Sequence, residues 1–119
     1  MRGTKFTVIG MGKYGKAIAN ILSNRGAEVI AIDNREELIE DIQDDVALAV
    51  TMDATERKAL EAQNIQESDA VVVAIGTNFE ALILCCFQLQ ELGVSRIIAR
   101  ANEERQKAIL QKMGIKEIL

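Results

Sequence analysis

The 119-residue sequence predicts an α/β domain built on a doubly wound parallel sheet, and three observations support this fold class. Strand-like apolar runs alternate with helix-like apolar stripes along the whole chain, which is the pattern of β-α-β units. A G-x-G-x-x-G turn at residues 10–15 joins the first run to the first stripe. The length fits one compact domain and leaves no room for a second. We therefore expect a Rossmann-like sheet with strand order 3-2-1-4-5-6, whose ligand crevice lies above the carboxyl ends of the first and fourth strands.

Six runs are short and apolar enough to be the strands of this sheet. They are Lys5–Ile9, Glu28–Ile32, Leu48–Thr51, Ala70–Ile75, Arg96–Arg100 and Lys116–Leu119. Helices are expected between them, with apolar residues on one face: Ala17, Ile18, Ile21 and Leu22 in the first, and Leu38, Ile39 and Ile42 in the second. Gly26 and Gly93 stand where a helix needs a left-handed residue before the next strand.

The predicted helix Asn78–Leu92 differs from the others because its apolar residues surround the whole circumference. Such a helix is covered on more than one side. The cover is supplied either by neighbouring helices of the same domain or by a second copy of the chain. The second alternative predicts a homo-oligomer, in which a charged substitution at Leu84 or Leu89 changes the assembled mass without unfolding the domain.

Composition argues against several classes of function. The net charge of −4 and the lack of a Lys/Arg cluster disfavour nucleic-acid binding. The longest apolar runs, Ala70–Ile75 and Ala81–Phe87, fall short of the roughly 20 residues that span a bilayer, so we expect no direct membrane insertion. Cys85 and Cys86 are neighbours in one helical pattern and are expected to be reduced core thiols. Histidine, the commonest general base and metal ligand, is absent, and we expect neither catalytic residues nor a metal site.

The glycine turn is the strongest sign of a ligand. Gly10 permits the tight turn, Gly12 lets the backbone approach a pyrophosphate, and Gly15 lets the helix pack close to the strand. The free N–H groups of the following helix then point at the phosphates. Lys13 either reaches a terminal phosphate or is simply solvated. The expected phosphate side of the site is Gly10, Met11, Gly12, Lys13, Tyr14 and Gly15.

Two acidic residues follow the second and third strands. Asp33 can accept hydrogen bonds from both ribose hydroxyls and repels a 2′-phosphate; alternatively it caps the helix that begins near Arg35, a residue that could itself reach a phosphate. Asp53 either accepts from the adenine amine or caps a helix in a capping box with Glu56. The rest of the expected site comprises Asn34, Arg35 and Ala54 beside these acids, and Ala74, Ile75, Gly76, Thr77 and Asn78 on the far wall, where Asn78 also suits a helix N-cap.

These motifs together resemble the RCK or KTN domain of Ktr and Trk potassium-transport regulatory subunits. The resemblance lies in residues 8–15, 33, 53–55, 73–81 and 97–102 and covers nearly the whole chain. It implies a cytoplasmic module, peripheral to the inner face of the cell membrane, that binds NAD(H) or ATP/ADP. It also implies a homo-oligomer, as dimers or rings, that regulates a membrane potassium channel or transporter subunit and catalyses no reaction.

Carried over residue by residue, the resemblance assigns the phosphates to the glycine turn, the ribose to Asp33 and the adenine to Asp53. Lys13 stands where the family often has an arginine near the terminal phosphate, and Arg100 becomes a further phosphate ligand. Met52 stands where the family usually has glycine, which leaves the conformation of the adenine-side loop open. The family's smaller C-terminal domain is missing, so residues 1–119 are expected to form a single domain that is compatible with the N-terminal part of a longer chain.

Two other functions are alternatives at this point. The first is a cofactor-binding fragment of an NAD-dependent dehydrogenase, although the sequence offers no acid or base to face a nicotinamide. The second is an NADH-sensing repressor, although the sequence shows neither a helix-turn-helix nor a basic face for DNA.

Overall fold

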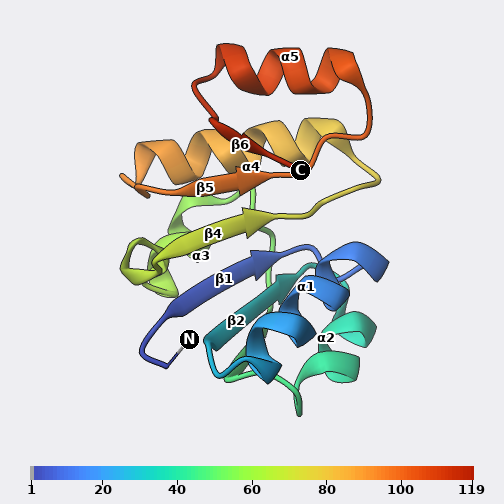
Figure 1. The fold of residues 1–119 in the computed structure, drawn as a ribbon, viewed down its shortest axis with the longest axis vertical. Coiled ribbons are helices and arrows are strands. Elements are labelled where there is room, and N and C mark those ends of the chain that lie inside the picture. Colours follow the sequence, from blue (N-terminus) through green and yellow to red (C-terminus); the bar gives the residue numbers. More distant parts are fainter. Residues whose placement is uncertain (1) are drawn as a thin grey trace.

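A computed structural model of the chain describes residues 2–119 as a single parallel sheet flanked by helices (Figure 1). The elements in chain order are β1 (Lys5–Ile9), α1 (Lys13–Asn24), β2 (Glu28–Asp33), α2 (Glu36–Ile42), β3 (Leu48–Thr51), α3 (Arg57–Ala62), a 3-10 turn (Ile65–Glu67), β4 (Ala70–Val73), α4 (Phe79–Glu91), β5 (Ile97–Ala99), α5 (Glu104–Lys112) and β6 (Glu117–Ile118). Every strand pairing is parallel, in the order β3-β2-β1-β4-β5-β6. The predicted fold class and strand order are confirmed.

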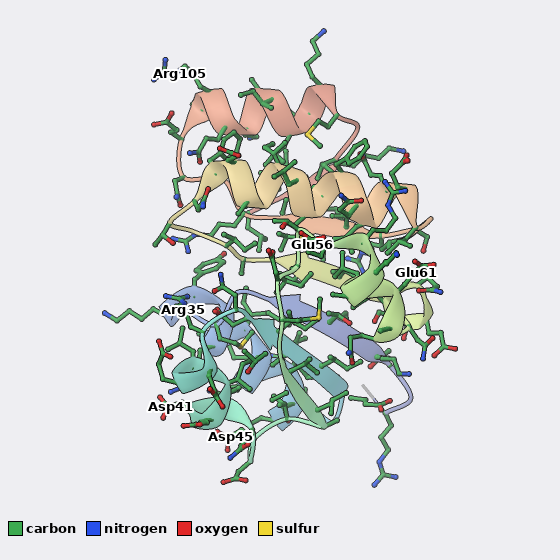
Figure 2. All side chains as sticks on the ribbon, turned by 180° about the vertical axis from the view of Figure 1, so that it is seen from behind. Arg35, Asp41, Asp45, Glu56, Glu61 and Arg105 are labelled. Carbon is green, nitrogen blue, oxygen red and sulfur yellow. The ribbon has the colours of Figure 1, made fainter. Side chains whose placement is uncertain are left out.

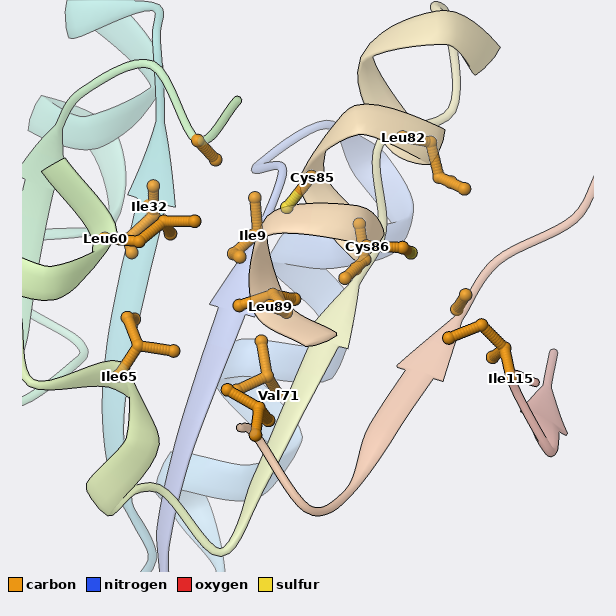
Figure 3. Close-up of a cluster of buried hydrophobic side chains, with 14 of the residues drawn as sticks. Ile9, Ile32, Leu60, Ile65, Val71, Leu82, Cys85, Cys86, Leu89 and Ile115 are labelled. Carbon is orange, nitrogen blue, oxygen red and sulfur yellow. The ribbon is translucent and has the colours of Figure 1, made fainter. Parts of the chain in front are cut away.

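Side chains that alternate along the strands divide the core into two layers. Val8, Ala31 and Val72 pack with α1 and α2 on one face of the sheet. Ile9 and Val71 belong to the other face, which α3 and α4 cover (Figure 3). Charged side chains point away from both layers, for example from α2, α3 and α5 (Figure 2). Because the inner strands are covered on both faces, their sequences are largely apolar.

The last three strands are shorter than the sequence predicts. β4 ends at Val73 and not at Ile75, because the chain turns away after the Ala74 N–H donates to the Ile9 carbonyl at 2.7 Å. β5 and β6 keep only Ile97–Ala99 and Glu117–Ile118. β6 is the sheet edge and pairs with β5 alone, so it has few partners that could extend it.

The buried face of α1 differs from the expected one. Gly15 and Ala19 are buried, and Ile18 and Leu22 are partly buried, but Ala17 is exposed and Ile21 is 55% exposed. The close approach of Gly15 to the preceding turn sets the rotation of the helix, so small residues face the sheet and Ile21 faces solvent. In α2 the prediction is correct: Ile39 and Ile42 are buried and Leu38 packs beside them.

Helix α4 is buried on one side and exposed on the other. Leu82, Cys85, Cys86 and Leu89 lie in the core (Figure 3). The prediction of buried, free thiols is confirmed. Leu84 and Phe87 remain 42% and 45% exposed. Leu89 is fully buried inside its own domain, so the expectation that a charge there would spare the fold is wrong.

Helix termini follow the predicted signals. Gly26 and Gly93 have φ values of 91° and 77°, in the left-handed region where glycine avoids a side-chain clash. The Asn78 side chain accepts a hydrogen bond from the Ala81 N–H at 3.0 Å and caps α4 as expected. No helix among residues 2–119 combines the length and apolar character that crossing a bilayer requires.

Candidate functional site

A cleft of about 780 Å³ opens at the carboxyl ends of β1, β2 and β4. This volume is within the range of small-molecule sites. Every predicted site residue lines the cleft except Met11 and Gly15, which are both buried. Five lining residues were missing from the prediction: Ile9, Ala17, Met52, Thr55 and Ala81. Most of them are neighbours of predicted residues in the sequence or lie one helical turn away, and that adjacency was the available signal.

Packing requires glycine at two of the three glycine positions of the turn, whereas the third borders open space. Gly10 has a φ of 99°, and a Cβ there would lie 3.0 Å from the backbone of Ala74 and Ile75. A Cβ on Gly15 would overlap the carbonyl oxygen of Gly10. A Cβ on Gly12 would meet nothing within 4 Å. Gly10 and Gly15 therefore bring α1 against β1, while Gly12 keeps space free in front of the helix N-terminus.

Asp33 is the most constrained polar group of the cleft. The residue is 5% exposed, and its carboxylate accepts from the backbone N–H groups of Met11 at 2.6 Å and Arg35 at 2.9 Å. The Arg35 guanidinium also donates to both oxygens, at 3.1 Å each. Burial opposes ionisation, but the hydrogen bonds from Arg35 and Met11 outweigh it and lower the pKa of Asp33. Because α2 begins only at Glu36, Asp33 orders the turn before the helix and is not its N-cap.

Asp53 lines the cleft after β3, the strand that pairs with β2, and is exposed. Its Oδ1 accepts from the Thr55 N–H at 2.9 Å and the Thr55 hydroxyl at 2.7 Å, and these bonds lower the pKa of the carboxyl. The capping-box alternative is wrong, because α3 begins at Arg57 and Glu56 occupies its N-cap position without a side-chain bond. Asp53 therefore closes a local turn and presents a charged carboxylate to the cleft.

Two basic side chains lie at the glycine-turn side. The Arg100 guanidinium stacks over the Tyr14 ring, 4.7 Å from its centroid. Gly76 makes room for it, because a Cβ at that position would overlap the guanidinium. The Asn102 side chain fixes this wall by donating to the Gly76 carbonyl at 2.8 Å. Lys13, at the first position of α1, lines the same region. The cleft thus carries Lys13 and Arg100 beside the glycine turn, and the Asp33–Arg35 pair and Asp53 at the ends of β2 and β3.

The TrkA-N domain model matches residues 6–119, nearly the whole chain. The chain belongs to the TrkA-N family. Among its relatives, the Ktr system potassium uptake protein C of Bacillus subtilis is 36% identical over 115 residues, which are 97% of this chain and 52% of the relative. The Ktr system potassium uptake protein A of Vibrio alginolyticus is 30% identical over 115 residues, with the same coverage of both chains. The chain spans about half the length of these relatives.

Solved structures support this assignment and the fold of the TrkA-N domain. The RCK domain of GsuK is 26% identical and superimposes with a TM-score of 0.81 over 98% of this chain and 25% of that one. The NAD(P)-binding domain of an exopolyphosphatase-related protein from Archaeoglobus fulgidus has a TM-score of 0.86 at 23% identity, over 96% of this chain and 85% of that one, and shows the shared fold. The predicted resemblance to RCK and KTN domains is confirmed.

The chemistry of this TrkA-N cleft is that of binding. Both carboxylates that line it have lowered pKa values, so at neutral pH they are charged hydrogen-bond acceptors and not proton donors. The backbone N–H groups at the start of α1, together with Lys13 and Arg100, are suited to an anion. An elongated ligand with a phosphate at one end and hydroxyl or amine donors at the other matches this distribution of charge.

Proposed function

We propose that this TrkA-N domain is the nucleotide-binding part of a cytoplasmic subunit that regulates a membrane potassium channel or transporter. The observation that carries the proposal is the placement of the glycine turn, Asp33 and Asp53 around one cleft. In this arrangement the phosphates of an adenine nucleotide bind in front of Gly12, the ribose binds at Asp33, and the adenine amine donates to Asp53. Regulation then depends on which nucleotide is bound, and the chain catalyses no reaction.

The ligand in this proposal is NAD(H) or ATP/ADP. Lys13 and Arg100 add two positive charges at the phosphate end, and neither forms an ion pair with a carboxylate of residues 2–119. Such charges favour a ligand with more than one phosphate group. Structures with the same fold at 13% identity are described as the GsuK channel bound to NAD and GsuK bound to ADP.

The potassium-transport role rests on the relatives. Several relatives are potassium uptake proteins of Ktr and Trk systems, and they match this chain over most of its length. The dehydrogenase alternative has less support, because neither carboxylate of the cleft is poised to exchange a proton near neutral pH. A binding module whose ligand shifts the balance between two assembly states fits both observations.

We also propose that the domain forms a homo-oligomer, as a dimer or a ring, through the outer face of α4. Leu84 and Phe87 form an exposed apolar patch one turn apart on this helix. Arg57 lies 6.0 Å from the Phe87 ring and borders the patch with its charge. Leu84→Glu should lower the mass measured by light scattering while the circular dichroism spectrum stays unchanged; an unchanged mass argues against this interface.

Calorimetric titration of the purified domain with ATP, ADP, NAD and NADH tests the central proposal. At least one should bind, and Asp33→Asn should weaken it tenfold or more, which is ~1.4 kcal/mol. Arg96→Gln, on the far edge of the sheet and paired with Glu117, is the matched control and should bind like wild type. Absence of binding by all four ligands rejects the nucleotide site. Potassium flux in vesicles that is the same with ATP, ADP and NADH rejects the regulatory role.

A further inference from the structure

The carboxylate of Asp33 has no free acceptor position. An ionised carboxylate offers about four lone-pair sites on its two oxygens. Oδ2 accepts from the Met11 N–H at 2.6 Å and from Arg35 Nη2 at 3.1 Å. Oδ1 accepts from the Arg35 N–H at 2.9 Å and from Arg35 Nε at 3.1 Å. Each oxygen therefore holds one backbone donor and one donor from the Arg35 guanidinium.

The backbone donors are fixed by the fold, whereas the guanidinium donors belong to a side chain that can move away from Asp33. The Met11 and Arg35 N–H groups belong to the turns after β1 and β2, so they hold the carboxylate in place as long as the fold is intact. The Arg35 side chain is 48% exposed and lies at the periphery of the molecule (Figure 2). Glu37, in the first turn of α2, adds a further negative charge near the guanidinium.

A ribose with free 2′- and 3′-hydroxyls needs the two acceptor positions that the guanidinium holds. We propose that Arg35 is a specificity-determining residue, an internal ligand that covers the ribose-binding side of Asp33 and that the nucleotide ribose must displace. This inference rests on the proposed nucleotide site. Its consequence is that the ribose alone binds weakly, and a ligand whose phosphates are also held at the glycine turn binds well. Arg35 thereby selects nucleotides over nucleosides.

The test uses adenosine, an uncharged probe that isolates the ribose end from the phosphate charges. Adenosine and 2′-deoxyadenosine are titrated into wild type, Arg35→Gln and Arg96→Gln, and binding is followed by the Met11 amide signal in nuclear magnetic resonance spectra. Arg96→Gln removes the same charge from another bidentate pair, with Glu117 at 2.8 Å for both contacts, away from the cleft. Unchanged amide spectra outside the cleft show that the variants keep the fold.

Arg35→Gln should bind adenosine about fivefold more tightly than wild type, the worth of a half-exposed ion pair of ~1 kcal/mol. The gain should be smaller for 2′-deoxyadenosine, because one hydroxyl displaces only one guanidinium contact. Added salt should tighten adenosine binding to wild type but not to Arg35→Gln. Arg96→Gln should match wild type throughout.

Equal or weaker binding of adenosine by Arg35→Gln overturns the inference, because the guanidinium would then be neutral toward the ligand or help to hold it. A gain that is the same for both nucleosides also overturns it, because the competition would not involve the ribose diol. Failure of the proposed function gives a different result: if wild type binds none of ATP, ADP, NAD and NADH, the cleft is not a nucleotide site, and the inference about Arg35 falls with it.

Discussion

Gly12→Ala and Gly15→Ala should have different effects although both residues lie in one turn: the first should weaken ligand binding, and the second should lower the stability of the fold. At Gly15 the new methyl group would occupy the position of the Gly10 carbonyl oxygen and lie 3.3 Å from the Ala74 side chain. Backbone cannot rotate away like a side chain, so α1 must move off β1 and loosen the contact of Ala19, which is fully buried. We expect a loss of about 3 kcal/mol, the upper part of the range for overpacked cores. For 119 residues this corresponds to a fall in Tm of about 10 °C.

At Gly12 the same methyl group meets open space and an extended backbone, with φ of −67° and ψ of −172°. The loss of a favourable N-cap residue and the reduced entropy of the unfolded chain oppose each other, each at roughly 0.5–1 kcal/mol. Stability should therefore change by less than about 0.5 kcal/mol. The methyl group nevertheless stands where a phosphate must approach the α1 N–H groups, so nucleotide affinity should fall tenfold or more.

Urea unfolding and calorimetric titration of both variants decide between these effects. The reasoning predicts a stable Gly12→Ala protein that has lost affinity and a destabilised Gly15→Ala protein. A Gly15→Ala variant with the wild-type Tm would refute the packing argument. Full affinity in Gly12→Ala would show that no phosphate approaches this turn.

Three further predictions concern the rest of the fold. Asp33→Asn should lower the free energy of unfolding by about 2 kcal/mol at pH 7. Because the folded-state pKa of Asp33 lies below its ordinary 3.8, this difference from wild type should shrink only as the pH drops through and below 3.8. Urea titrations that show a constant difference down to pH 2 contradict this prediction. Leu89→Ala should lower the free energy of unfolding by about 3 kcal/mol, whereas Leu84→Ala should change it by less than about 0.5 kcal/mol, because only Leu89 is buried. Similar urea midpoints for the two variants would contradict this prediction. Burial raises the pKa of Cys86 to about 12 and also raises that of Cys85, so an aromatic disulfide reagent should label neither thiol until urea unfolds the domain; rapid labelling of the native protein would contradict this.

The sheet and most of the cleft could be predicted because both depend on local patterns. Alternating apolar runs determine the strand order once crossovers are right-handed, and the carboxyl ends of parallel strands bring residues 10, 33 and 74 together whatever the details of packing. Asn78 was predictable as a cap because its side chain bonds within three residues.

The errors share a different cause, which is contact between segments or competition within one turn. Ile21 follows the helical apolar pattern, yet Gly15 rotates α1 so that Ile21 faces solvent. Asp53 has capping-box spacing, but Thr55 takes its carboxylate before the helix begins. Arg35 lines the cleft as expected, but its residue type did not predict that its guanidinium is bound to Asp33. None of these outcomes follows from residue type and spacing alone.

Helix α4 is the element that connects the cleft to the exposed apolar patch. Its N-cap, Asn78, and its first-turn residue Ala81 line the cleft. Leu84 and Phe87 lie one and two turns further along the same helix and are exposed. Leu82 and Leu89, which flank Leu84 and Phe87 along the helix, anchor α4 in the core. In the proposed function a nucleotide alters an assembly only if the two assembly states bind it with different affinity. Under that proposal, a nucleotide that contacts the N-terminus of α4 creates such a difference by displacing the helix, because Leu84 and Phe87 belong to the same helix and move with it.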